Sequence, residues 1–260
     1  MASLKKGGET LAYWIDGKPG RPWLTLSHSI AGSSAMWDGL VRDLADEYQI
    51  LRTDTRGHGA SLTSGGSFSF AELASDVVAI WDELGIEKSH FAGLSLGGMI
   101  GQQLGFDHGD RLDRLVLCDC RPDAGEAFLA MWDGRIDAVK AGGMASIVDS
   151  TLERWFTQGF RTGEPELMAE IAGIIAATRV EGYLGCVAAV QGLTNSPRLG
   201  SITAPTLLLV GDEDGEHPEL MRAMANLIPD STYVEIPDAA HVPNIEQPAA
   251  FRAALLDFLR

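Results

Sequence analysis

The stretch of the chain that most constrains its fold is Gly93–Gly98, which reads Gly-Leu-Ser-Leu-Gly-Gly. An apolar run ending at Ala92 precedes it, and a run with helical character begins at Met99. A Gly-x-Ser-x-Gly sequence between a strand and a helix predicts a sharp, strained turn that exposes the serine hydroxyl above a sheet. Glycines fit this turn because a larger side chain would collide with the neighbouring strand or helix. Ser95 is therefore the candidate nucleophile.

Short apolar, β-rich runs alternate with amphipathic stretches along most of the chain. This alternation predicts a mostly parallel sheet covered by helices on both faces, an α/β fold. The predicted strands are Leu11–Ile15, Trp23–Ser27, Gln49–Thr53, Ser89–Gly93, Arg114–Cys118, Thr206–Val210 and Thr232–Ile236. The predicted helices around them are Ala35–Ala45, Phe70–Leu84, Leu96–Gly105, Pro218–Leu227 and Pro248–Leu259.

The alternation breaks between residues 121 and 197, where helical patterns occur without a convincing strand. The helices predicted there are Ala127–Val139, Met144–Phe156, Glu166–Ala177 and Glu181–Gln191. Open α/β sheets bind ligands at the carboxyl ends of their strands, so a helical insertion after a central strand is expected to cover the active site. The 260 residues are therefore predicted to form one core, residues 1–120 and 198–260, with a helical cap at 121–197.

A serine hydroxyl is a weak nucleophile that needs an adjacent base, and the base needs a third group to orient it. In chains with a Gly-x-Ser-x-Gly turn between a strand and a helix, the acid and then the histidine follow the serine along the sequence. Asp214 comes after one late predicted strand and His241 after the next, so both would emerge at the same sheet edge as Ser95. His241 is therefore the predicted general base and Asp214 the predicted orienting acid.

Four other carboxylates compete with Asp214 for the acid role. Asp212 and Glu213 are its neighbours, but a residue a few positions beyond the strand lies in the turn that reaches across to the histidine. Asp119 and Asp123 follow the preceding strand and form a weaker alternative.

The tetrahedral intermediate of such a reaction needs two backbone amide donors. The N–H of Leu96 is expected to be one, because it begins the helix after the nucleophile, where free amides and the helix dipole favour an anion. The second is expected from the loop after the strand Trp23–Ser27, with Ile30 as the chosen donor.

The other candidate residues are interpreted as structural. His58 lies in the glycine-rich segment 54–61, which fits a tight turn held by local hydrogen bonds. Four more histidines have no catalytic context and are expected to be surface or structural residues: His28, His90, His108 and His217. Three is an odd number of cysteines for a disulfide framework, so they are expected to be buried, reduced thiols: Cys118, Cys120 and Cys186. No metal or cofactor is predicted.

Composition limits the partners. A formal charge of −16 argues against nucleic acid and against an anionic membrane, because such binding depends on Lys and Arg. No apolar stretch approaches the roughly 18 residues of a membrane span, and no apolar segment follows the N-terminal residues as in a signal peptide. A cytoplasmic protein acting on a small molecule is expected, with its oligomeric state open.

At this point the chain resembles the α/β-hydrolases, and within them the bacterial 3-oxoadipate enol-lactonases. The resemblance covers nearly the whole length and rests on residues 34–38, 54–61, 93–101 and 239–248 in the core and on 131–136, 153–157 and 181–183 in the cap. It implies a cofactor-free serine hydrolase that opens a small lactone or ester through an acyl-enzyme. The chain departs from the family pattern at Ser29–Ala31, at Gly215–Pro218 and at Arg179.

The enol-lactone implied by this resemblance carries a carboxylate, which a protein of charge −16 repels at long range. A local cation must offset that repulsion, and a guanidinium matches a carboxylate with two parallel hydrogen bonds. The candidates in the cap are Arg135, Arg154 and Arg179, with Trp132 and Trp155 as possible pocket walls. A general carboxylesterase, a perhydrolase, a carbon–carbon bond hydrolase and a non-catalytic ligand receptor are the alternatives.

Overall fold

The computed structural model describes residues 1–260 and contains one eight-stranded sheet with the order β1-β2-β4-β3-β5-β6-β7-β8. The β1–β2 and β2–β4 pairs are antiparallel, and every other neighbouring pair is parallel. The strands are β1 Ala2–Lys6, β2 Glu9–Gly17, β3 Trp23–Ser27, β4 Gln49–Thr53, β5 Ser89–Leu94, β6 Leu112–Cys118, β7 Thr206–Gly211 and β8 Ser231–Ile236.

All seven predicted strands are present, and the predicted α/β class with a mostly parallel sheet is confirmed. Only β1 escaped prediction. It is five residues long, largely exposed, and pairs with β2 alone at the sheet edge, so it carries no apolar run that would identify it. By contrast, β5 and β7 are buried at every residue because helices cover both faces of the sheet, which gives them continuous apolar sequences.

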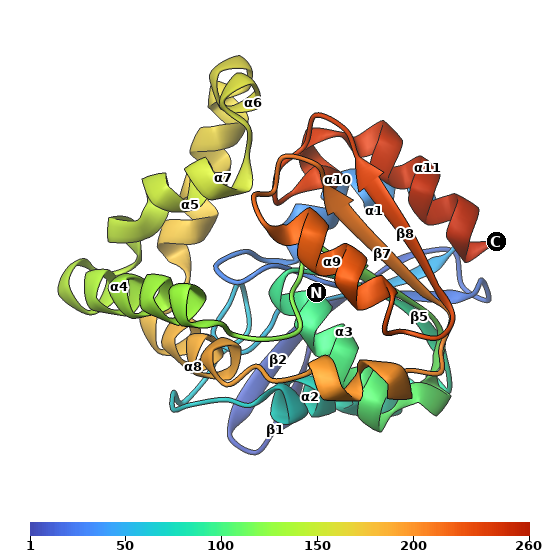
Figure 1. The fold of residues 1–260 in the computed structure, drawn as a ribbon. Coiled ribbons are helices and arrows are strands. Elements are labelled where there is room, and N and C mark those ends of the chain that lie inside the picture. Colours follow the sequence, from blue (N-terminus) through green and yellow to red (C-terminus); the bar gives the residue numbers. More distant parts are fainter.

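Helices lie on both faces of the sheet (Figure 1). Helices α1 and α11 contact each other on one face, whereas α2 and α3 contact each other on the opposite face. Helix α9 joins the second group, because Met221 lies against Cys120 and Cys120 lies against Gly98 of α3. The bounds of the helices outside the segment between β6 and β7 are α1 Asp38–Leu44, α2 Phe70–Glu83, α3 Leu96–Asp107, α9 His217–Ala225, α10 Pro243–Glu246 and α11 Pro248–Leu259.

Between β6 and β7 the chain is helical and forms a group of its own at the left of Figure 1. Its helices are α4 Glu126–Gly142, α5 Val148–Trp155, α6 Gln158–Gly163, α7 Pro165–Ala177 and α8 Val180–Gln191. Four of these match predicted helices, and the six-residue α6 was not predicted. The division into core and cap at residues 121 and 197 stays a prediction.

No single helix combines the length and the apolar character needed to cross a membrane; α7 and α8 meet that requirement only as a pair, and the pair is bent by 88°. The three cysteines are buried and free of disulfides, as expected from their number.

Candidate active site

Ser95 connects the end of β5 to the start of α3 in a strained backbone conformation. Its φ of 54° and ψ of −107° lie in a region that residues other than glycine rarely adopt. The backbone N–H of Ser95 donates to the carbonyl oxygen of Cys118 at 2.8 Å, and its own carbonyl accepts from Met99 at 2.9 Å. The turn is therefore fixed on both sides, by the end of β6 and by the first turn of α3.

The glycines on either side of Ser95 are required by close contacts. A Cβ atom on Gly93 would lie 2.1 Å from the carbonyl oxygen of Gly97. A Cβ atom on Gly97 would lie 2.3 Å from the carbonyl oxygen of Ser27 at the end of β3. Both distances are too short for any real Cβ atom, so these positions exclude every side chain while the turn keeps its shape.

Asp214 and His241 form a buried hydrogen-bonded pair. Nδ1 of His241 lies 2.7 Å from Oδ2 of Asp214, and both residues are at most 5% exposed. The opposite ring nitrogen of His241, Nε2, is also buried and has no hydrogen-bond partner in the protein. A histidine held in this way by a carboxylate has its second nitrogen ready to accept a proton.

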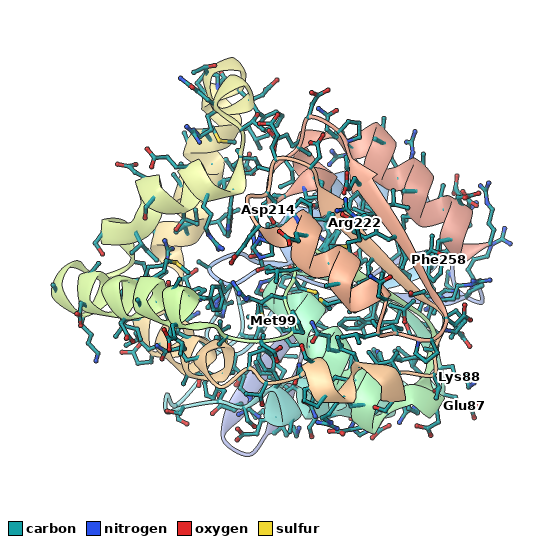
Figure 2. All side chains as sticks on the ribbon, viewed as in Figure 1. Glu87, Lys88, Met99, Asp214, Arg222 and Phe258 are labelled. Atoms are coloured by element: carbon teal, nitrogen blue, oxygen red, sulfur yellow. The ribbon has the colours of Figure 1, made fainter.

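A chain of contacts joins this pair to the serine turn. Ser95 donates to Cys118, the next residue Asp119 lies beside Asp214, and Asp214 binds His241. These residues lie at the ends of β5 and β6 or in the loops that follow β7 and β8, so they gather at the carboxyl edge of the sheet. Figure 2 shows Asp214 before α9 on the side toward helices α4 and α5, with Arg222 farther along α9.

Among the alternative acids, none reaches His241. Asp212 accepts a hydrogen bond from the backbone N–H of Ala239 at 3.4 Å, and Glu213 is exposed. Asp123 accepts hydrogen bonds from the N–H and hydroxyl of Ser196 and so ties the two ends of the helical segment together. Asp119 is buried against Asp214 instead of against the histidine.

Burial dominates the electrostatics of the histidine. It lowers the pKa of His241 below the ordinary value of 6.5, although the Asp214 carboxylate acts in the opposite direction. Burial by itself would raise the pKa of Asp214, but the two neighbouring histidines and their hydrogen bonds hold it below its ordinary value. At neutral pH the pair therefore consists of a carboxylate and a neutral imidazole.

His217 is a second histidine at Asp214 that sequence reasoning classed as surface or structural. Its Nδ1 lies 3.2 Å from Oδ2 of Asp214 and 3.2 Å from the Asp214 carbonyl oxygen. Its ring centroid is 5.3 Å from that of His241. The sequence signal that could have indicated this contact is the position of His217, three residues after the acid and at the first residue of a helix.

The donor atoms of Asp214, His217 and His241 lie within 4.8 Å of one another, the only such group of metal-ligand residues in the chain. A metal ion there would have to displace the hydrogen bond between Asp214 and His241, which is already short and buried. The geometry favours an acid–base pair over a metal centre.

Two backbone amides are free for an oxyanion. Neither the N–H of Leu96, at the start of α3, nor that of Ile30 donates to another protein group. The loop that carries Ile30 is held by His28, whose Nδ1 contacts the Ser29 carbonyl oxygen at 2.7 Å while Nε2 accepts from the N–H of Thr55 at 2.9 Å. Burial lowers the pKa of His28, so its ring stays neutral in this structural role.

The glycine-rich turn 54–61 also has a structural arrangement. The Asp54 carboxylate accepts from the N–H groups of Ser34 and Ala60, both at 2.7 Å. His58 is fully buried and contacts the Arg56 carbonyl oxygen at 3.0 Å, and burial lowers its pKa to about 3.

Beside Asp214 lies a pocket between the start of α9 and the helices α4 and α5. Its walls include the side chains of Phe128, Met131, Arg154, His217 and Arg121. Arg121, which sequence reasoning did not select, stacks 3.8 Å from the Phe128 ring and pairs with Glu216 at 2.8 Å. The pocket therefore combines an apolar wall with two guanidinium groups and with carboxylates, those of Glu153, Glu213, Asp214 and Glu216.

Arg154 is the one predicted arginine that remains without a protein partner. Its Nε is buried and unpaired, and its side chain makes neither a hydrogen bond nor an ion pair within the chain. Burial lowers its pKa to about 10, so the guanidinium remains charged at neutral pH. Arg154 is half-buried in the pocket wall, and a charge partly withdrawn from water without a partner is costly, so an anion bound there would be favoured.

The other two arginines are engaged inside the protein. Arg135 donates to the hydroxyls of Tyr183, Ser150 and Thr151. Arg179 donates to the carbonyl oxygens of Gly59 at 3.0 Å and Ser61 at 3.2 Å, so it ties the helical segment to the turn 54–61.

The two tryptophans occupy different places. Trp132 is buried between Phe128 and Tyr183, within the helical segment. Trp155 lines a small apolar cavity with Gly32 and other residues near the Ile30 loop.

A sequence model of the family described as "alpha/beta hydrolase fold" matches residues 22–248. The chain belongs to the α/β-hydrolase fold family. It is 33% identical to 3-oxoadipate enol-lactonase 2 of Acinetobacter baylyi over 94% of this chain and 91% of the relative. With these relatives, the prediction of an ester-hydrolysing enzyme of this family is confirmed.

Solved structures agree with this family assignment. The enol-lactonase of Burkholderia xenovorans LB400 superposes with a TM-score of 0.95 at 34% identity, covering 99% of both chains. A thermophilic esterase from Thermogutta terrifontis, described as malate bound, superposes with a TM-score of 0.91 at 29% identity, covering 99% of this chain and 96% of the other.

Proposed function

We propose that this α/β-hydrolase opens a small carboxylate-bearing lactone by acyl transfer to Ser95, with His241 as general base and Asp214 as its orienting acid. The observation that carries the proposal is the buried 2.7 Å contact between Asp214 and His241, at the same sheet edge as the strained turn of Ser95. These three groups provide a nucleophile, a base and an orienting acid, which acyl transfer requires.

In the first step, Nε2 of His241 takes the hydroxyl proton while the Ser95 oxygen attacks the lactone carbonyl carbon. The N–H groups of Leu96 and Ile30 donate to the oxyanion that develops. Collapse of this intermediate breaks the ring C–O bond, and the imidazolium returns its proton to the departing oxygen. Water activated by the neutral His241 then attacks the acyl carbon and releases Ser95.

One feature of the pocket supports a carboxylate-bearing substrate. Arg154 presents a charged guanidinium without a protein partner beside Asp214 and His217. A carboxylate on the substrate would neutralise this half-buried charge and accept two parallel hydrogen bonds. That local attraction would offset the repulsion of an anion by a protein of net charge −16.

An enol-lactone is the favoured ester within this class. The names of the Acinetobacter and Burkholderia relatives specify enol-lactonases, and both match nearly the whole chain. In an enol-lactone the departing oxygen is that of an enol, which leaves more readily than an alkoxide. 3-Oxoadipate enol-lactone is therefore the first substrate to test.

The deciding experiment compares Ser95→Ala with the wild-type protein on 3-oxoadipate enol-lactone and on p-nitrophenyl acetate. The variant is expected to lose turnover of both while keeping its circular dichroism spectrum and Tm. Retained turnover in Ser95→Ala would refute the role of this serine.

A general carboxylesterase is the second candidate, because the same three residues serve neutral esters. The two functions differ in the ratio of kcat/KM for the anionic lactone to that for the neutral ester, which should strongly favour the lactone. A ratio at or below one would favour the esterase.

Cytoplasmic location remains a prediction.

A further inference from the structure

Asp119 is a buried carboxyl group that the proposed mechanism does not use. It follows β6 directly and is 0% exposed, with a φ of 44° that non-glycine residues rarely adopt. Its backbone N–H donates to the Leu209 carbonyl oxygen at 3.0 Å. The strained backbone is therefore held in place by β7, the strand that leads to Asp214.

The two oxygens of the Asp119 carboxyl group have different surroundings. Oδ1 accepts a hydrogen bond from the N–H of Gly211 at 2.9 Å. Oδ2 is buried and receives no hydrogen bond from any donor. The carboxylate of Asp214 is the acidic side chain that neighbours the Asp119 carboxyl group. Two acceptor-only carboxylates cannot share such a contact, but a protonated carboxyl group is a donor.

We propose that Asp119 is a neutral carboxylic acid that donates its proton to Asp214 and acts as a positioning residue for the Asp214–His241 pair. Through this hydrogen bond, the proton stays on Asp119 and Asp214 alone carries the negative charge that orients the base. The inference rests on the proposed triad, because the positioning matters only if Asp214 is the acid.

Other ionisable groups near Asp119 agree with this protonation. The neighbouring thiols Cys118 and Cys120 are fully buried, and burial raises the pKa values of both, so both stay neutral. Burial raises the pKa of Asp119 well above its ordinary value, and the Asp214 charge adds to the effect. The cationic or titratable groups His217, His241 and Arg154 act on Asp214.

Asp119→Asn is the informative variant. The amide keeps an acceptor for the Gly211 N–H and a donor for Asp214, but it cannot ionise. If Asp119 is neutral, Asp119→Asn does not change the charge near His241. The acid midpoint of the pH profile of kcat/KM should then stay within about 0.3 pH units of the wild-type value. If Asp119 were ionised, removal of its charge would move that limb down by roughly one unit, which would overturn the proposal.

Asp119→Leu keeps the branched skeleton of the side chain but removes the donor to Asp214 and the acceptor of the Gly211 N–H. Because a hydrogen bond to a charged group is worth about a factor of ten or more, kcat should fall at least tenfold while KM changes less than twofold. A lowered Tm with unchanged kcat would show a merely structural role and contradict the proposal. The matched control is Asp123→Asn, which removes the charge of a carboxylate after the same strand that contacts Ser196 instead of Asp214.

A spectroscopic readout needs neither turnover nor the Leu variant. The infrared difference spectrum of wild type minus Asp119→Asn should contain the C=O stretch of a protonated carboxyl group, shifted in ²H₂O. The corresponding difference for Asp123→Asn should contain carboxylate bands only. Carboxylate bands alone in the Asp119 difference would refute the neutral acid, and loss of the serine mechanism would leave this spectrum unaffected.

Discussion

Nδ1 of His217 lies 3.2 Å from Oδ2 of Asp214, the same oxygen that His241 contacts. An imidazole at this distance both shares the carboxylate with the proposed base and lowers the pKa of that base by its nearby charge. His217 also lines the pocket, together with Arg154 and Asp214 itself.

His217→Phe is expected to lower kcat by about three- to tenfold, because Asp214 loses one hydrogen-bonding neighbour. Loss of the histidine should also shift the acid limb of the kcat/KM profile upward, since His217 lowers the pKa of His241. Steady-state kinetics across pH with a neutral ester measures both effects. Unchanged kcat and an unchanged profile would show that the contact is incidental.

Asp214→Asn should reduce kcat by about 10⁴-fold, because an amide orients the imidazole in the wrong tautomer and no longer stabilises its charged form. Asp212→Asn is the matched control, since Asp212 contacts the Ala239 backbone and should retain activity within threefold. Equal losses in the two variants, measured with p-nitrophenyl acetate, would contradict the assignment of Asp214.

The pH profile of kcat/KM is expected to have its acid midpoint below pH 6.5. Burial disfavours the imidazolium form of His241, so the neutral base persists to lower pH than a solvated histidine would allow. Activity falls as the pH drops through the lowered pKa. A neutral ester keeps substrate ionisation out of the measurement, and a midpoint above 6.5 would show that the Asp214 carboxylate outweighs burial.

Arg154→Leu should raise KM for an anionic lactone at least tenfold and leave KM for a neutral ester within about twofold, because the guanidinium is the unpaired cation of the pocket. Arg252→Leu is the control, because it makes the same change in net charge at an exposed pair with Asp43. An equal rise in KM in both variants would indicate a long-range charge effect instead of direct binding.

Gly97→Ala should destabilise the fold by roughly 1–3 kcal/mol or more and disable the serine turn, since the new Cβ would lie 2.3 Å from the Ser27 carbonyl oxygen. Gly134→Ala, in the interior of α4 with open space around its Cβ position, should instead stabilise by about 0.5–1 kcal/mol. Urea denaturation of the two variants tests the pair. A stable, active Gly97→Ala protein would contradict the close packing of the turn.

The residues near strand ends were predictable because their signals are local. The Gly-x-Ser-x-Gly turn and the acid each follow an apolar run that identifies a buried strand, β5 or β7. The histidine follows β8, which its β-rich sequence identifies although only Ile236 of that strand is buried. The missing strand β1 shows the limit of this reasoning, since an exposed edge strand lacks the apolar pattern.

Local sequence signals did not predict the roles of the three arginines or of the alternative acid Asp119. Arg135 and Arg179 look like Arg154 in sequence, yet their partners Tyr183 and Gly59 come from segments far along the chain. Asp119 was weighed as an alternative acid, and only the packing of β6 beside β7 places it against Asp214.

The sequence by itself determined the α/β fold, the strained turn at Ser95 and the order of acid and histidine. These features depend on residues that are close together in the sequence, because apolar runs form strands and glycines form tight turns. The tertiary structure alone decided which arginine is left unpaired, that His217 contacts Asp214 and that Asp119 lies against the same carboxylate. Hydrogen bonding and burial of a side chain depend on which distant segments pack around it, and those contacts exist only in the folded chain.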